Sequence, residues 1–343
     1  VLQELTPPPR EIYNAIISRI KILAKLNIAE KRLPQDGRIK MKVAGKEVDL
    51  RVSIIPMSYG EGVVMRILDR TAVTLDLEKL GFGREFLLKF RRIVNKPEGM
   101  LLVTGPTGSG KTTTLYAVLK ELVSPETKII TVEDPVEYSM EGVNQIQVNP
   151  QIDLTFASGL RSVLRHDPDI ILIGEIRDRE TASIAIQSAL TGHLVLSTLH
   201  TNDSASAFTR LMDMGMEDYL LSSCIIGVLA QRLVRKICEK CREAYVPGED
   251  LRLTARLKEG EYLYKAGGCD ECNNSGFKGR KCIAEFLVVD DAIRRLVLAH
   301  KDSGEIMKQA VKSGTKNLWE DGLEAVRRGE TTLEELLRVS SDT

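Results

Sequence analysis

The stretch GPTGSGKT, residues 105–112, restricts the fold of this chain more than any other feature. It follows the apolar run MLLV and precedes LYAVLKELV, whose apolar residues recur at helical spacing. A strand, a glycine-rich turn and a helix in this order match the complete P-loop pattern. Glycines allow successive backbone N–H groups to turn towards phosphates, and the helix N-terminus adds its positive end. The pattern therefore predicts a nucleotide site in an α/β domain.

Individual residues of this stretch have distinct expected roles in holding ATP. We expect Lys111 to place its ammonium group against the β- and γ-phosphates, and Thr112 to offer its hydroxyl to Mg²⁺. The other residues of the loop and first helical turn are expected to line the phosphates: Gly105, Pro106, Thr107, Gly108, Ser109, Gly110 and Thr113. The alternative is a glycine-rich turn without function, which would have to meet four conditions by chance.

Short apolar runs alternate with helical segments on both sides of the loop. The runs are MLLVTG, KIITVED, DIILIGEI and LVLSTLH. Strands that are buried on both faces and separated by helices form a parallel sheet. Ligands of open α/β sheets bind at the edge where the carboxyl ends of the strands meet. We therefore expect residues 99–237 to form an α/β core with its nucleotide site at that edge.

Two of these runs end in acidic residues. Glu133 and Asp134 end the second run, and Glu175 follows Gly174 in the third. A carboxylate at this edge can hold Mg²⁺ or orient an attacking water, so these residues favour an enzyme over a passive binder. Glu175 is a candidate magnesium ligand beside Thr112, and which of Glu133 and Glu175 activates water stays open. The alternative is strands that end at surface acids.

Two histidines bracket the fourth run. His193 precedes it, and His200 follows it. A histidine beyond the end of a core strand can approach the γ-phosphate and respond to its loss. His200 is therefore a candidate catalytic residue, and His193 is a second candidate for contacting the nucleotide. Either could instead be an ordinary structural histidine.

Four of the six cysteines form two C-x-x-C pairs. Cys238, Cys241, Cys269 and Cys272 offer four thiolates, which is the usual ligand set of a structural zinc site. Two disulfides or unliganded thiols are the alternative, which a reducing compartment disfavours. Residues 238–285 are too poor in apolar residues to fold alone, so we expect Zn²⁺ to fold them as an insert.

The flanking segments predict smaller structural units. Residues 1–70 are expected to form a small α+β domain, with a helix over residues 10–28, a hairpin near Ala44 and Gly45, and a strand over residues 63–68. The expected helix places Ile12, Ile16, Ile20 and Leu23 on one face. Residues 71–98 are expected to be a linker and the first helices of the core, and residues 286–343 a C-terminal helical subdomain.

Composition narrows the class of protein. The chain of 343 residues carries 48 basic and 48 acidic side chains, and aromatic residues make up only 5%. Zero net charge and few aromatic residues argue against a nucleic-acid partner. No apolar run approaches the roughly 20 residues of a membrane span. The chain begins with Val1 rather than methionine, so we expect native sequence upstream.

These motifs, taken in order, resemble the secretion-ATPase superfamily of ring-shaped motors. The similarity is greatest to the ATPases of type II secretion and of type IV pilus extension. It spans residues 26–339 and rests on these stretches: LNIAEKRLPQDGRI, GPTGSGKTTTLYA, ITVEDPVEY, LRHDPDIILIGEIRDRETA, TGHLVLSTLHTNDSASAFTRL, LAQRLVRKIC and LWEDGLEAVRRGETTLEELLRV. The resemblance implies a RecA-like core, a PAS-like small domain and a tetracysteine insert.

The resemblance also implies roles for residues that chemistry alone leaves open. Residues 105–112 would be its Walker A, Glu133 and Asp134 its aspartate box, Glu175 its Walker B acid, and both histidines its histidine box. In this family the smaller domain directs arginines at the phosphates, and the matching residues here are Arg38, Arg51 and Arg66. An arginine that reaches the γ-phosphate when domains close can couple hydrolysis to motion.

The function implied by the resemblance is a homohexameric, cytoplasmic ATPase that works on an inner-membrane platform. It would hydrolyse ATP to extend a pseudopilus in type II secretion, and pilus extension is the alternative. The family carries an acidic strand and a further domain upstream of residue 10, so we expect the N-terminus to be truncated. A DNA-translocating ring motor and a nucleotide-gated scaffold without activity are the alternatives of other classes.

Overall fold

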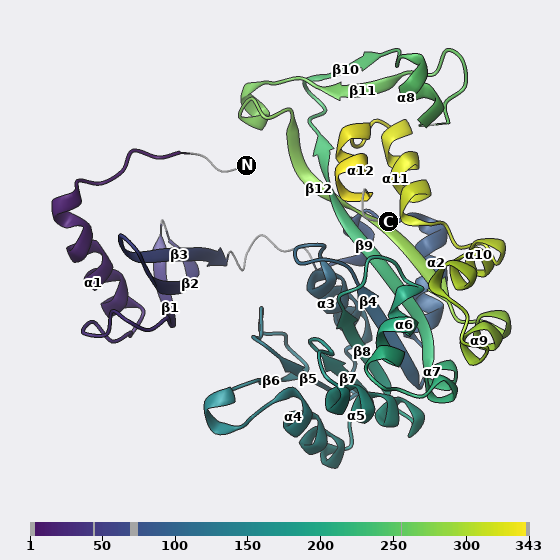
Figure 1. The fold of residues 1–343 in the computed structure, drawn as a ribbon, viewed down its shortest axis with the longest axis horizontal. Helices are drawn as coiled ribbons and strands as arrows, with labels where there is room; N and C mark the ends of the chain where they lie inside the picture. Colours follow the sequence, from purple (N-terminus) through teal and green to yellow (C-terminus); the bar gives the residue numbers. More distant parts are fainter. Residues whose placement is uncertain (1–3, 44, 69–74, 255, 341–343) are drawn as a thin grey trace. The chain divides into compact units, whose positions relative to one another are not determined.

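The computed structural model describes residues 4–43, 45–68, 75–254 and 256–340, and it divides into two compact units (Figure 1). The first unit is Val1–Thr74, and the second is Leu75–Thr343. Residues 71–74 of the predicted linker lie outside the described residues. No helix among the described residues has the length and apolar character needed to cross a membrane.

The small unit is a helix packed on an antiparallel sheet. Its described elements are α1 (Tyr13–Leu23), β1 (Gln35–Val43), β2 (Lys46–Met57) and β3 (Gly60–Leu68), with the strands in the order β1-β2-β3. Val43 pairs with Lys46, which confirms the predicted hairpin. The core of the unit comprises Ala24, Ile39, Val52 and Ile54.

The buried face of α1 differs from the predicted one. Ile12, Ile16 and Leu23 are exposed, whereas Ile17 and Lys21 are buried. Lys21 can be buried on this face because its Nζ donates to the Glu61 carboxylate at 2.5 Å and to the Glu30 carbonyl at 2.6 Å. A buried ammonium group must find such partners, and apolar periodicity alone does not reveal them.

The large unit is built on a sheet of seven described strands in the order β12-β9-β4-β8-β7-β5-β6. The strands are β4 (Gly99–Thr104), β5 (Ile129–Glu133), β6 (Val143–Gln147), β7 (Ile170–Ile173), β8 (Leu194–Leu199), β9 (Ile225–Ile237) and β12 (Phe277–Val288). The four predicted strands β4, β5, β7 and β8 are confirmed. The sheet is mixed rather than wholly parallel, because β12 pairs antiparallel with β9.

Helices cover both faces of this sheet, which gives a three-layer α/β arrangement (Figure 1). One face is covered by α2 (Arg84–Val94) and α3 (Lys111–Leu122). The other face is covered by α4 (Phe156–Val163), α5 (Arg179–Leu190), α6 (Ser206–Asp213), α7 (Asp218–Cys224), α9 (Asp291–Leu298) and α10 (Ser303–Lys312). Residues of β4 alternate between the two cores, as strand geometry requires: Leu101 faces the first and Leu102 the second.

The predicted insert is smaller than residues 238–285. Residues 277–285 belong to β12, where Cys282 is buried in the core of the large unit. The rest contains β10 (Arg242–Tyr245), α8 (Glu249–Thr254) and β11 (Leu263–Ala266). Leu263 packs into a cluster with the last two helices, α11 (Leu318–Arg327) and α12 (Leu333–Ser340). The long apolar strand β9 provides the partner that makes β12 part of the sheet.

Candidate nucleotide-binding site and cysteine cluster

The P-loop joins β4 to α3 and has a backbone that demands glycine. Gly105, Gly108 and Gly110 have φ angles of 143°, 80° and 92°, which side chains rarely adopt. A Cβ atom on Gly105 would also lie 2.5 Å from the Gln231 carbonyl oxygen. Thr112 is exposed on the first turn of α3, and Ser109 is buried beneath the loop. Residues 106–108 of the loop and Thr112 are therefore open to solvent.

Lys111 lies folded back over this loop. Its Nζ donates to the carbonyl oxygens of Gly105 at 2.8 Å and Pro106 at 3.2 Å. Burial lowers the pKa of Lys111 to about 8, with Glu175 opposing the shift and Arg232 adding to it. The ammonium group thus stands where a negatively charged ligand would stabilise it.

Glu175 and His200 lie close to Lys111, as predicted. His200 Nε2 is 3.6 Å from Glu175 Oε2. Burial and the charge of Lys111 lower the pKa of His200, so the imidazole tends to be neutral. Glu175 also pairs with Arg177, whose pKa is raised chiefly by that hydrogen bond and further by the charge of Asp134. Asp134 itself is exposed beyond the end of β5.

Glu133 is placed differently from Glu175. It is only 3% exposed, and both of its carboxylate oxygens accept hydrogen bonds inside the unit. The donors are Tyr116, Thr131 at 2.5 Å and Gln145 at 3.2 Å. The structure therefore holds Glu133 in a buried polar network, although it ends a strand at the predicted edge.

The structure does not bring His193 to the P-loop. His193 immediately precedes β8, whereas the P-loop follows the carboxyl end of the parallel neighbour β4. Its Nδ1 lies 2.9 Å from the Ser188 carbonyl, and its own carbonyl accepts from Gly99 at the start of β4. The two histidines lie at opposite ends of β8 (Leu194–Leu199), so only His200 lies at the edge of the sheet that carries the P-loop.

Two residues of β9, whose roles the sequence analysis did not assign, support the loops of the site. Gln231 Nε2 donates to the Ser109 carbonyl at 2.8 Å, and Thr114 donates to Gln231 Oε1 at 3.0 Å. Arg232, 5% exposed, donates to the Asn202 carbonyl at 2.7 Å in the loop that follows His200. The sequence feature that could have indicated these two residues is their position directly after the apolar run IIGVLA.

Three arginines of the small unit lie in one row across its sheet. Arg38 is paired with Arg51, and Arg51 is paired with Arg66, on adjacent antiparallel strands. Directly opposed residues share a face of the sheet. The structure thus brings the three predicted arginines together on one face of the small unit.

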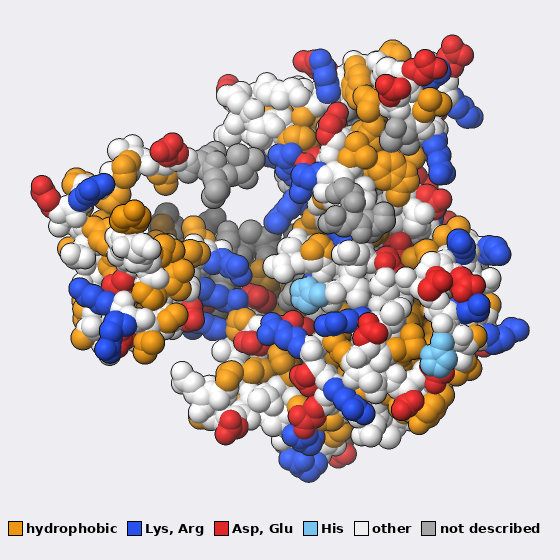
Figure 2. All heavy atoms as spheres, viewed as in Figure 1, with side chains coloured by type: hydrophobic (Ala, Val, Ile, Leu, Met, Phe, Trp, Pro, Cys, Tyr) orange, Lys and Arg blue, Asp and Glu red, His pale blue; other side chains and the backbone are white. Residues whose placement is uncertain are grey.

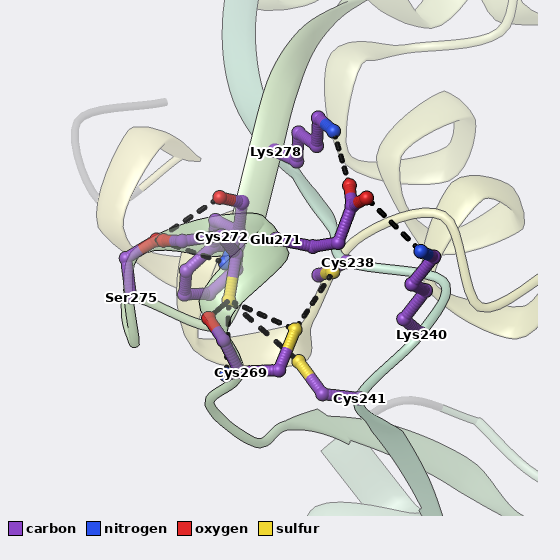
Figure 3. Close-up of polar contacts among 9 residues, drawn as sticks. Cys238, Lys240, Cys241, Cys269, Glu271, Cys272, Ser275 and Lys278 are labelled. Atoms are coloured by element: carbon purple, nitrogen blue, oxygen red, sulfur yellow. Dashed lines mark hydrogen bonds and ion pairs between the residues drawn. The ribbon is translucent and has the colours of Figure 1, made fainter.

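The four predicted cysteines converge on one point (Figure 3). Their Sγ atoms all lie within 4.8 Å of one another. Cys238 and Cys269 are 3.8 Å apart, Cys241 and Cys272 are 3.8 Å apart, and Cys269 and Cys272 are 3.7 Å apart. These separations are too long for disulfide bonds, whose sulfur atoms are about 2.0 Å apart.

Backbone amides favour negative charge on one thiol of this cluster, Cys272. Cys272 Sγ accepts from its neighbours' amides, Cys269 N at 3.3 Å and Gly276 N at 3.2 Å. Burial opposes ionisation, but these bonds and the neighbouring thiols lower the pKa of Cys272 to about 6. Glu271, which lies between Cys269 and Cys272, accepts hydrogen bonds from Lys240 at 3.0 Å and from Lys278 at 2.5 Å (Figure 3). These bonds connect the two C-x-x-C segments and the start of β12.

Comparison with known sequences gives one family over nearly the whole chain. The family described as type II/IV secretion system protein matches residues 1–338. The chain is 58% identical to the type II secretion system protein E of Xanthomonas campestris pv. campestris, over all of this chain and 61% of that protein. It is 52% identical to the type II secretion system ATPase E of Vibrio cholerae, over all of this chain and 68% of that protein. The chain therefore spans only part of the length of these relatives.

The chain is also similar to two pilus proteins, one by sequence and one by structure. The type IV pilus assembly ATPase PilB of Thermus thermophilus is 50% identical over 96% of this chain and 38% of that protein. The crystal structure of the pilus retraction motor PilT with bound ADP matches with a TM-score of 0.66 and 27% identity, covering 91% of this chain and 78% of that chain.

The protonation of Lys111 gives a prediction for nucleotide binding. With a pKa of about 8, roughly half of the Lys111 side chains are neutral at pH 8. A bound polyphosphate favours the ammonium form and raises this pKa, so binding at pH 8 takes up protons and weakens as the pH rises further. Calorimetry in two buffers of different ionisation enthalpy measures this uptake.

Lys111→Arg is the control for this measurement, because arginine stays protonated throughout the range. We expect the arginine variant to bind without proton uptake. Equal uptake in both proteins would assign the proton to another group.

Proposed function

Because the chain belongs to the type II/IV secretion system protein family, we propose that it is the ATP-hydrolysing motor of a type II secretion system. Membership of this family confirms the resemblance drawn from the sequence motifs. The observation that carries the proposal is the juxtaposition of Lys111, Glu175 and His200 at one edge of a P-loop sheet. Relatives named as type II secretion proteins over the whole chain support it.

The residues of the site supply the parts that phosphoryl transfer needs. Lys111 would contact the β- and γ-phosphates, while Thr112 and Glu175 would hold Mg²⁺, which neutralises charge on the phosphates. Glu133 or Glu175 would take a proton from a water molecule. The water oxygen then bonds to the γ-phosphorus as the bond to the bridging oxygen breaks, and ADP leaves. His200, kept neutral by its surroundings, can hydrogen-bond near the γ-phosphate.

The arginine row of the small unit completes the proposed site. Arg38, Arg51 and Arg66 would stabilise charge on the phosphates from this chain or from a neighbouring protomer. We take the small unit to correspond to the PAS-like domain of the family. A guanidinium row that engages only in one domain arrangement links turnover to domain movement.

The assembly that performs mechanical work is proposed to be a homohexameric ring in the cytoplasm. It would act on an inner-membrane platform protein, which gives it a peripheral position at that membrane. Extension of a type IV pilus is the second candidate, because the pilus assembly ATPase of Thermus thermophilus is 50% identical. A DNA motor is not favoured, since acidic and basic side chains are interspersed on the visible face of the large unit (Figure 2).

The cysteine cluster is proposed to hold one structural Zn²⁺. Four sulfur ligands at about 2.3 Å from a tetrahedral zinc lie about 3.8 Å from one another, because each tetrahedral edge is about 1.6 times the bond length. Three of the six sulfur–sulfur separations are 3.7 to 3.8 Å and fit this geometry, and all six lie within 4.8 Å. With all four positions taken by thiolates, the ion would fix the fold of residues 238–276 and leave catalysis to the P-loop edge.

ATP turnover tests the assignment of the active site. Lys111→Ala should remove the phosphate contact and abolish measurable hydrolysis. Glu133→Gln should bind ATP with little change and lower kcat by about 10²-fold or more, the usual contribution of a general base. Steady-state phosphate release and nucleotide titration measure both effects.

Lys120→Ala is the matched control, because Lys120 is exposed near the end of the same helix, α3. It should keep full turnover. Full activity of both Lys111→Ala and Glu133→Gln would contradict the proposed site.

The arginine row gives a prediction about kcat. Arg51→Ala should lower kcat by about 10³-fold, as expected for an arginine that stabilises the transferring phosphate. Arg19→Ala is the control, since Arg19 is exposed on α1 of the same unit. If Arg38→Ala and Arg51→Ala both hydrolyse ATP at the normal rate in the assembled ring, the coupling mechanism is wrong.

Metal content tests the zinc proposal without reference to activity. Purified protein should contain one zinc per chain by elemental analysis, and Cys272→Ser should lose it and make residues 238–276 sensitive to protease. Cys224→Ala should retain the metal, because Cys224 is buried elsewhere in the fold. Wild-type protein that contains no zinc and resists protease equally after chelation would refute the proposal.

A further inference from the structure

Glu133 is surrounded by donors from three different elements. Tyr116 on α3 donates to Oε2, while Thr131 on β5 and Gln145 on β6 donate to Oε1. With only 3% of its surface exposed, the carboxylate depends on these donors to remain buried. On the side of β7, Gly174 lies against the Glu133 backbone. In this arrangement the carboxylate has little capacity left to accept a proton from water.

Tyr116 occupies a central place in this network. It is fully buried on α3, the helix that begins with Lys111. Its hydroxyl oxygen also lies 3.3 Å from the Glu137 amide and 3.3 Å from Gln145 Nε2, both of which donate to it. Tyr138 packs edge-on against its ring, with the ring centres 6.0 Å apart. Tyr116 therefore connects the P-loop helix to the segment that follows Glu133.

We infer that Tyr116 is a positioning residue that holds Glu133 in a sequestered orientation, and that Glu133 activates water only after this hydrogen bond is released. The inference rests on the proposed function and adds a regulatory step to it. Release requires α3 and the segment around Glu137 to shift relative to each other, and α3 carries the nucleotide contact at its N-terminus. Filling of the P-loop and release of the base are thus linked through one helix.

The contrast with Glu175 supports this assignment. The Glu175 side chain is 14% exposed, pairs with Arg177 and lies 3.6 Å from His200 at the open edge of the site. Glu133 instead accepts hydrogen bonds from three neutral side chains, those of Tyr116, Thr131 and Gln145. Once released, Glu133 would accept one proton from the attacking water as the water oxygen bonds to the γ-phosphorus and ADP departs.

Tyr116→Phe tests the inference, because phenylalanine keeps the buried ring and removes only the hydroxyl. Losing one hydrogen bond to a carboxylate should favour the released orientation and increase kcat at pH 8 by up to about tenfold. The same loss makes the carboxylate easier to protonate, so the acidic limb of the kcat–pH profile should move up by about one pH unit. Both are measured by steady-state hydrolysis with the full-length protein.

Tyr219→Phe is the matched control, because Tyr219 is 57% exposed on α7 of the same unit. It should leave the kcat–pH profile unchanged. Thermal melting of both variants checks that the fold is intact. A folded Tyr116→Phe protein with an unshifted acidic limb, or with lower kcat and the same pH profile, would overturn the inference and make Tyr116 merely structural.

Glu133→Gln separates this result from failure of the proposed function. If Glu133→Gln loses turnover while Tyr116→Phe behaves as wild type, Glu133 is the base and the positioning role of Tyr116 is wrong. If Glu133→Gln keeps full turnover while Lys111→Ala loses it, the chain is an ATPase whose base is not Glu133, and the inference falls with that assignment.

Discussion

The parallel pairing of β4, β7 and β8 is the constraint on which the rest of the site depends. Thr104, the last residue of β4, pairs with Leu199 at the end of β8, so the segments that follow both strands begin at the same level. Ile173 pairs with Ser197, which places Glu175 just beyond the same edge. The Thr104 hydroxyl then accepts from the Thr201 amide at 2.8 Å and ties the loop after His200 to the root of the P-loop. Lys111, Glu175 and His200 meet because backbone pairing brings their strand ends together.

A second support comes from the antiparallel pair β9 and β12 beside the P-loop strand. Gln231 holds the loop from β9, while Glu285 on β12 accepts from the Ser204 amide at 2.8 Å and from the Leu318 amide at 3.4 Å. Ser204 follows the histidine loop, and Leu318 begins α11 of the C-terminal subdomain. Burial raises the pKa of Glu285, and the hydrogen bonds from Ser204 and Leu318 oppose this shift. The nucleotide edge and the C-terminal helices are therefore attached to the same two strands.

Positive side chains are grouped in each of the two units. Burial chiefly lowers the pKa of Lys111, and the charge of the buried Arg232 adds to this shift. Arg38, Arg51 and Arg66 occupy directly paired positions in the sheet of the small unit. The cysteine cluster instead brings four thiols together, which is a ligand set that could hold a metal cation.

The amino-acid sequence was enough to predict the P-loop, the four core strands, the acids at the ends of two of them and the tetracysteine cluster, because each depends on local spacing or on which residue types adjoin in the chain. Which of these residues meet became known only from the folded chain. The tertiary structure buried Glu133 against the hydroxyl of Tyr116 and placed residues 277–285 in the sheet rather than in the insert. It also turned α1 so that Lys21 rather than Ile12 and Ile16 is inside. These outcomes depend on hydrogen-bond partners and strand neighbours that lie on other elements of the fold, which periodicity within one segment does not contain.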